Sequence, residues 1–106
     1  MALDRRAPAG DLLRRRRQRM IRVLIPSQLL AYSGGQSRVE AEGATVDAVL
    51  DDLDRRFPGL KFRVIDEQSR IRKHMRIFIG RDAARDVRAP LADGDELLIF
   101  GALSGG

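Results

Sequence analysis

The chain has 106 residues, a length typical of one domain, and 43% of them are hydrophobic, which is enough for a small core. It contains no cysteine and one histidine, His74, which excludes a disulfide framework, a thiolate metal site, a cysteine nucleophile and His-rich metal centres. The formal net charge of +5 lies entirely in residues 1–19, because residues 20–106 carry 13 basic and 13 acidic side chains.

Residues 1–19 are predicted to be a basic, disordered extension. They are rich in Ala, Pro, Gly and Arg, lack hydrophobic periodicity, and place four like charges in a row at Arg14–Arg17. The arginines could contact RNA, a membrane or a protein partner, and Met20 could be the true initiator. No apolar run approaches the roughly 18 residues of a membrane-spanning helix, and the first residues lack a secretory signal. We therefore expect a cytoplasmic protein.

A hairpin is predicted at the start of the domain. From Met20 to Pro26, Ile21, Val23 and Ile25 share one face of a strand and Arg22 and Leu24 share the other. Ser37 to Glu42 alternates again, with Val39 and Ala41 inward. The intervening Gly34-Gly35 supplies the positive φ angles that a tight reversal needs.

The next segment is predicted to form an amphipathic helix of about three turns. Thr45 is a suitable N-cap, Asp47 favours the helix dipole, and Pro58-Gly59 ends the helix. Its apolar stripe consists of Val46, Val49, Leu50, Leu53 and Phe57.

The remaining elements are shorter. The segment Leu60–Ile65 is ambiguous, a short strand or a turn with Phe62 and Val64 inward. Strands are predicted at Met75–Ile79 and Glu96–Phe100. All four phenylalanines are assigned to the core, and Val87 and Leu91 are expected to anchor the polar connection between the last two strands.

The predicted order is strand, strand, helix, an uncertain strand, strand, strand. Since a hairpin precedes the only long helix, that helix must cover one face of a mixed sheet. The first and last strands, the longest apolar ones, are expected to pair at its centre. We predict an α+β fold of the ubiquitin-like β-grasp type, in which four to five strands cover one main helix.

Residues 20–106 resemble the MoaD/ThiS family of sulfur carriers. The resemblance rests on this order of elements, on the turn at Asp93–Glu96 and on the final Gly105-Gly106. The resemblance is greatest to carriers for cysteine or thiocarboxylate metabolite biosynthesis, and it rests on Ile25-Pro26, Gly34-Gly35, Phe57-Pro58-Gly59-Leu60 and Ile77-Phe78-Ile79. Before the diglycine, residues 101–104 depart from the proline and valine-alanine that are common in the family.

The resemblance implies that an activating enzyme adenylates the carboxylate of Gly106 with ATP, after which sulfur replaces AMP to leave a thiocarboxylate. Gly105 would thread the narrow channel of that enzyme, because glycine has no side chain to collide there. Phe100 and Leu103 would dock the partner. The carrier itself would have no catalytic residue, metal or bound cofactor, and would be a monomer when free. Its partners would be the adenylating enzyme and a sulfur-accepting synthase, with the tail spanning residues 101–106.

Several interpretations stay open. The sulfur could serve cysteine, molybdopterin, thiamine or another thiocarboxylate-dependent product. A ubiquitin-like modifier conjugated to lysines would use the same terminus, so the diglycine does not separate it from a carrier. A nucleic-acid-binding protein would use the arginine extension, but the phenylalanines assigned to the core leave no stacking platform.

Overall fold

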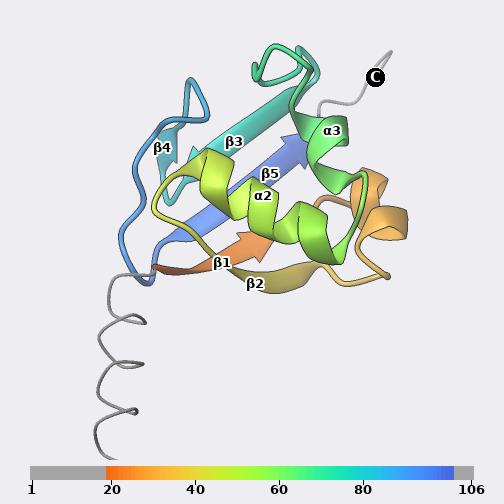
Figure 1. The fold of residues 1–106 in the computed structure, drawn as a ribbon, viewed down its shortest axis with the longest axis horizontal. Helices are drawn as coiled ribbons and strands as arrows, with labels where there is room; N and C mark the ends of the chain where they lie inside the picture. Colours follow the sequence, from red (N-terminus) through yellow and green to blue (C-terminus); the bar gives the residue numbers. More distant parts are fainter. Residues whose placement is uncertain (1–18, 102–106) are drawn as a thin grey trace, which may run out of the picture.

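A computed structural model describes residues 19–101 (Figure 1). Its elements follow the chain as β1 (Met20–Leu24), η2 (Ser27–Tyr32), β2 (Arg38–Glu42), α2 (Val46–Arg56), α3 (Leu60–Val64), β3 (Met75–Ile79), β4 (Asp82–Ala83) and β5 (Glu96–Gly101). Within residues 19–101, no helix has the length and apolar character required to span a membrane.

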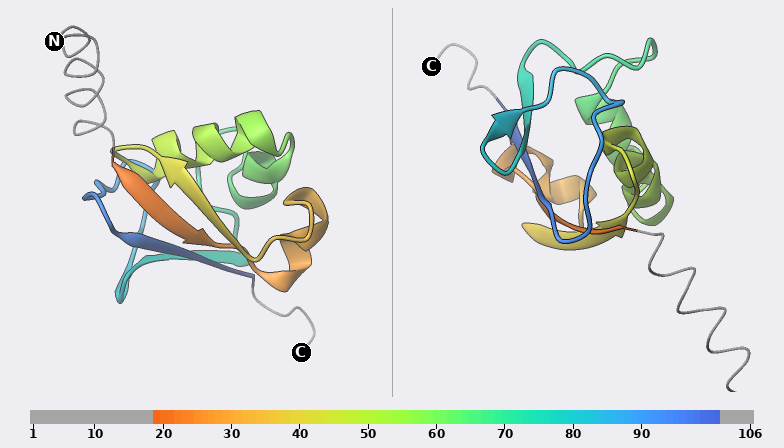
Figure 2. Two further views of the ribbon diagram at one scale, coloured as in Figure 1. Left: turned by 90° about the horizontal axis from the view of Figure 1, so that it is seen from below. Right: turned by 90° about the vertical axis from the view of Figure 1, so that its left-hand side faces the viewer.

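The five strands form one mixed sheet in the order β2-β1-β5-β3-β4. β1 and β5 run parallel at its centre, and every other neighbouring pair is antiparallel. Figure 2 shows α2 and α3 on one face of the sheet and the opposite face without a helix. The predicted β-grasp arrangement is therefore confirmed, including the central pairing of the first and last strands.

The N-terminal hairpin has the predicted alternation, with Ile21 and Val23 of β1 and Val39 and Ala41 of β2 buried against the helix. The connection between its strands was not predicted. It contains the 3-10 helix η2, whose Leu29 is buried in the core. The chain then reverses at Gly34-Gly35, where φ is +65° and +82°.

Helix α2 forms where the sequence predicts it. The Thr45 hydroxyl oxygen accepts a hydrogen bond from the Ala48 amide at 3.1 Å, which caps the first turn. The connection after β4 also supports this helix end, because the carbonyls of Ala89 and Val87 accept from the Val46 and Asp47 amides. The stripe residues inside the helix are buried, and Phe57, which follows the last turn, is half-buried.

The segment after α2 differs from the prediction. Residues 60–64 form α3, in which Leu60 and Val64 are buried while Phe62 is 54% exposed. An inward Phe62 fits the period of a strand, whereas the helical spacing of four residues selects Leu60 and Val64. The assignment of Phe62 as inward was wrong, and so was the assignment of Phe62 and Phe100 to the core, whereas the half-buried Phe57 packs against the core.

The connection between β3 and β5 contains the two-residue strand β4, which the sequence analysis missed. Val87 and Leu91 are buried, as predicted. At the other end of the described chain, the carbonyl of Arg19 accepts a hydrogen bond from the Gly43 amide at 2.9 Å. The hydrogen bonding between the first two strands thus begins at Arg19, and the rest of the predicted basic extension, residues 1–18, lies outside the described residues.

Leu53 provides a test of this core. It is fully buried on α2, so Leu53→Ala should lower the free energy of unfolding by about 2–5 kcal/mol through lost burial and the cavity left behind. Arg55→Ala, on the exposed face of the same turn, should change it by less than about 0.5 kcal/mol. Denaturant unfolding measures both variants, and equal losses would contradict the assigned orientation of the helix.

Candidate functional site

The described chain ends at Gly101, the last residue of β5, and the structure fixes this point firmly. Gly101 pairs with Met75 of β3, and its carbonyl accepts a hydrogen bond from Nε2 of Gln28 in η2 at 3.1 Å. A Cβ on Gly101 would lie 2.5 Å from the same Nε2. Glycine therefore lets the Gln28 amide reach the strand, and we call the Gly101–Gln28 contact the root of the tail.

Of the predicted functional residues, the structure describes only Phe100. Its side chain is 47% exposed on the face of the sheet away from α2. The proposed attachment residue Gly106, the threading residue Gly105 and the docking residue Leu103 lie outside the described residues, so their roles stay predictions.

Phe100 belongs to an apolar cluster on this outer face. Its ring meets Phe78 of β3 edge-on, with centroids 5.7 Å apart and planes at 75°. The strand register continues the row through Leu98 to Leu24 of β1. We call these four side chains, Leu24, Phe78, Leu98 and Phe100, the outer patch. The other three members of the patch were not predicted as docking residues. The period of two in β1, β3 and β5 nevertheless places them on the face opposite the buried Val23, Ile77 and Leu97.

The same face becomes polar beyond Leu24. A shallow groove of about 510 Å³ lies there, and its charged lining consists of Arg22, Arg38, Glu40, Arg56 and Glu96. Both signs of charge alternate along it, so the groove favours no ligand of a single charge. The outer patch next to the root, which is apolar, is therefore the better candidate for a docking surface.

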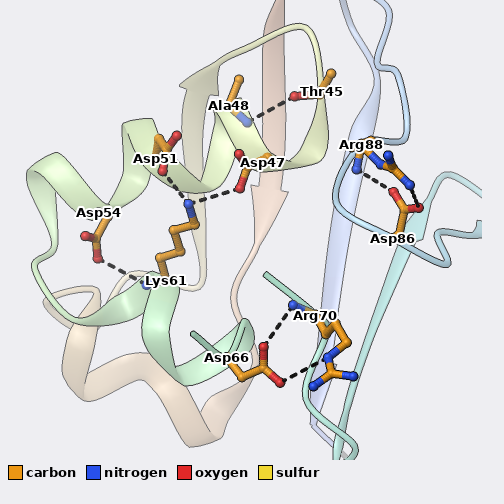
Figure 3. A network of polar contacts seen from close by, with 10 residues as sticks. All are labelled: Thr45, Asp47, Ala48, Asp51, Asp54, Lys61, Asp66, Arg70, Asp86 and Arg88. Atoms are coloured by element: carbon orange, nitrogen blue, oxygen red, sulfur yellow. Dashed lines mark hydrogen bonds and ion pairs between the residues drawn. The ribbon is translucent and has the colours of Figure 1, made fainter. Parts of the chain in front are cut away.

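The acidic residues of α2 form a structural network (Figure 3). The Lys61 ammonium lies 3.0 Å from Oδ1 of Asp47 and 2.5 Å from Oδ1 of Asp51. Oδ1 of Asp54 accepts hydrogen bonds from the amides of Gly59 and Lys61, which satisfies the first turn of α3. These carboxylates hold α3 against α2, and within residues 19–101 no cluster of His and acidic side chains is suited to hold a metal.

The network shifts the pKa of Lys61. Burial at the junction opposes the charged form and lowers the pKa, but hydrogen bonds to Asp51 and Asp47 and their negative charges outweigh this effect. The pKa of Lys61 is therefore raised above its ordinary 10.5. In the loops, backbone amides hold the pKa values of Asp66 and Asp86 below 3.8, with the amide of Arg70 acting on Asp66 and that of Arg88 on Asp86.

Comparison with known proteins gives consistent matches. The profile of the ThiS family matches residues 23–106. The sulfur carrier protein CysO of Mycobacterium tuberculosis is 32% identical over 91 residues, which cover 81% of this chain and 98% of that protein.

Solved structures agree with this match. In the BexX/CysO complex of Amycolatopsis orientalis, a chain with 34% identity superposes with a TM-score of 0.77 over 81% of this chain and 99% of its own. The small archaeal modifier protein 1 of Methanosarcina acetivorans superposes with a TM-score of 0.70 at 26% identity, over 84% of this chain and 98% of its own.

The α2–α3 network predicts an alkaline limb of stability. Because the folded pKa of Lys61 lies above the unfolded value, its contribution is complete below pH 10.5 and is lost as the pH rises through the folded pKa. Lys61→Met should lower the melting temperature below that pH, and the gap in melting temperature between this variant and the wild type should narrow above it. Lys73→Met, at the only other lysine, should leave the melting temperature unchanged at every pH. Thermal unfolding between pH 7 and pH 11.5 checks this, and a difference independent of pH would contradict it.

Proposed function

The chain belongs to the ThiS family, and from this premise we propose that it carries sulfur as a thiocarboxylate on the carboxyl carbon of Gly106. One observation carries the proposal. The family profile matches residues 23–106, a range that includes most of the folded domain and Gly106. Relatives covering four-fifths of the chain are named sulfur carriers, which supports the same function.

The chemistry proceeds in two displacements. A Gly106 carboxylate oxygen attacks the α-phosphorus of ATP, and pyrophosphate leaves to give an acyl adenylate. Sulfide then attacks the acyl carbon, AMP leaves with the bonding electrons, and a thiocarboxylate remains. With a persulfide as donor, the first product is an acyl disulfide, and a thiol must cleave its S–S bond to release the thiocarboxylate.

The carrier supplies the reacting carbon, and the groups that accelerate these steps belong to its partners. Among residues 19–101 there is no cysteine, and the single histidine, His74, is exposed beside the start of β3. The protein is thus a co-substrate of an ATP-dependent adenylating enzyme and later of a sulfur-accepting synthase. ATP binds the enzyme, and the carrier needs no cofactor of its own.

The fold contributes a fixed origin for the tail and a surface to hold it. The root at Gly101 is held by pairing with β3 and by the hydrogen bond from Gln28, so the five residues that follow in the sequence have a defined starting point. The outer patch lies directly beside this root, with Phe100 one residue away. We assign docking of the activating enzyme to this patch together with Leu103, because an exposed aromatic ring such as Phe100, packed on a second ring, is a typical anchor of an interface.

A second candidate is a protein modifier that forms isopeptide bonds with lysines. The similarity to small archaeal modifier protein 1 favours it. Both functions pass through the same adenylate, and they differ in the nucleophile that displaces AMP. Protein trapped from cells distinguishes them: a mass gain of one sulfur-for-oxygen exchange indicates a carrier, and a ladder of larger conjugates indicates a modifier.

The diglycine gives the central prediction. Removing Gly106 should abolish thiocarboxylate formation, and Gly105→Ala should impair it by obstructing the channel. Neither change should alter the melting temperature, because both residues follow the folded domain. Ser104→Ala, next to the diglycine, should retain loading. Mass spectrometry after incubation with the cognate activating enzyme, ATP and a sulfur donor provides the measurement. If protein lacking Gly106 loads as well as the intact chain, the terminus is not the reactive group.

The outer patch gives a second prediction. Phe100→Ala should raise the KM of the activating enzyme for the carrier about tenfold, as expected for an aromatic anchor worth about 1–2 kcal/mol, with little change in kcat. Met20→Ala is the matched control, because Met20 is 43% exposed and lies at the opposite end of the sheet. Steady-state kinetics of adenylation compare the two, and equal effects would exclude a role specific to Phe100.

A further inference from the structure

The neutral domain separates its charges strongly along the sequence. Residues 39–54 contain six acidic side chains and no basic one. Residues 70–88 contain seven basic side chains and two acidic ones. The basic group consists of Arg70, Arg72, Lys73, Arg76, Arg81, Arg85 and Arg88.

The sheet converts this separation into a separation in space. The acidic segment forms β2 and most of α2, and the basic segment forms β3, β4 and their flanks. Since the strand order is β2-β1-β5-β3-β4, the two segments occupy opposite edges of the sheet (Figure 1). Of these two edges, only the one formed by residues 70–88 adjoins the root, because Met75 and Arg76 of β3 pair with Gly101 and Phe100.

A hollow of about 200 Å³ lies on this basic edge. It lies where β4, which pairs with only Phe78 and Ile79, leaves the outer side of the first half of β3 without a neighbouring strand. The apolar part of its lining comes from Ile71, Met75, Ile77, Ala83 and Ala84. Its cationic part comes from Arg72, Lys73, Arg76 and Arg85.

The backbone at this edge is already hydrogen-bonded, so added strands are disfavoured. The Met75 amide donates to the Arg72 carbonyl at 2.9 Å, and the Met75 carbonyl accepts from the Arg76 guanidinium at 2.9 Å. The charges, by contrast, are available. Within residues 19–101, no carboxylate forms an ion pair with Lys73, Arg76 or Arg85. Recognition at this edge therefore depends on side chains.

We propose that this basic edge, defined as Arg72, Lys73, Arg76 and Arg85, binds an acidic segment of the activating enzyme that places one apolar side chain in the hollow. The inference rests on the proposed function, and it adds an electrostatic contact to the apolar one at the outer patch. The two surfaces flank the same root, so one enzyme can engage both while the tail enters its active site. The acidic opposite edge would repel the same segment, which fixes the orientation of the carrier.

A nucleic acid is the other polyanion that such an edge could attract, and the structure disfavours it. Single-stranded nucleic acids bind through bases stacked on open aromatic faces. Two exposed aromatic rings lie beside this edge, and both already have a partner. The Arg72 guanidinium covers Phe62 at 4.5 Å from the ring centroid, and Phe100, opposite Arg76, packs edge-on against Phe78. An acidic protein segment needs no such face.

The experiment measures adenylation of the full chain by its cognate activating enzyme, as pyrophosphate release, over a range of salt concentrations. Lys73→Glu/Arg85→Glu reverses the basic edge. Arg38→Glu/Arg55→Glu makes the same change in net charge at the opposite edge and controls for long-range effects. Lys73→Arg/Arg85→Lys keeps the positive charge at both positions and alters the shapes of the two side chains. All six substitutions are at exposed positions, and unchanged melting temperatures verify folding.

At low salt, Lys73→Glu/Arg85→Glu should raise the KM for the carrier about tenfold or more, the usual scale of electrostatic steering. Its kcat should be retained, and its KM should depend less on salt than that of the wild type. Arg38→Glu/Arg55→Glu should behave as the wild type does. Lys73→Arg/Arg85→Lys, which keeps both charges, should restore the salt dependence of KM that the charge reversal loses.

Several outcomes would overturn the inference. Equal KM values for the two charge reversals would show that only the net charge of the carrier matters. A wild-type KM in Lys73→Glu/Arg85→Glu would show that the basic edge makes no contact with the enzyme. A single-stranded RNA oligonucleotide that binds the wild type and loses binding in this variant, with adenylation unchanged, would assign the edge to nucleic acid. A wild-type chain that is not adenylated at all would refute the proposed function first and this inference with it, whereas normal wild-type loading isolates a failure of the basic edge alone.

Discussion

The structure depends on the parallel pairing of its first and last strands. Val23 of β1 lies beside Leu97 of β5, and both are fully buried beneath α2. This pairing joins segments more than 70 residues apart, so the loop closure it requires must be offset by the core that it brings together. It also decides where function can reside. β5 occupies the centre of the sheet with a strand on each side, and the described chain ends at its last residue, Gly101.

The two edges of the sheet are closed by side chains of the chain itself. At β2, the Asp52 carboxylate accepts from the Glu42 amide at 3.0 Å, and the Arg56 guanidinium donates to the Glu40 carbonyl. At β3, Arg76 covers the carbonyl of Met75. Exposed strand edges invite pairing with other chains, and such contacts discourage it.

The residues that stabilise the fold and the residues proposed to react lie in different parts of the sequence. The core and the α2–α3 network hold the domain together, and the residues proposed to react lie beyond them. The surfaces between these two parts, the outer patch and the basic edge, meet at Gly101. A partner that reads both surfaces places the root, and hence the tail, in one orientation without any catalytic group on the carrier.

The sequence by itself determined the helix, the four longer strands, the buried stripe and the family resemblance. These features are local: a period of 3.6 or 2 residues, an N-cap at Thr45 and glycines at a reversal are visible in one stretch of chain. The sequence also pointed to Phe100 and to the diglycine, although Gly105 and Gly106 lie outside the described residues.

Only the tertiary structure decided η2, the orientation of Phe62, the outer patch and the basic edge. Phe62 turns outward because five residues form a helical turn on α2, held by Asp54 and Lys61. The outer patch requires Phe78 and Phe100, 22 positions apart, to meet across two strands. The charges of residues 20–106 cancel in any count along the chain. They become two opposed edges because the strand order separates β2 from β4, and strand order is set by long-range burial, which no local pattern records.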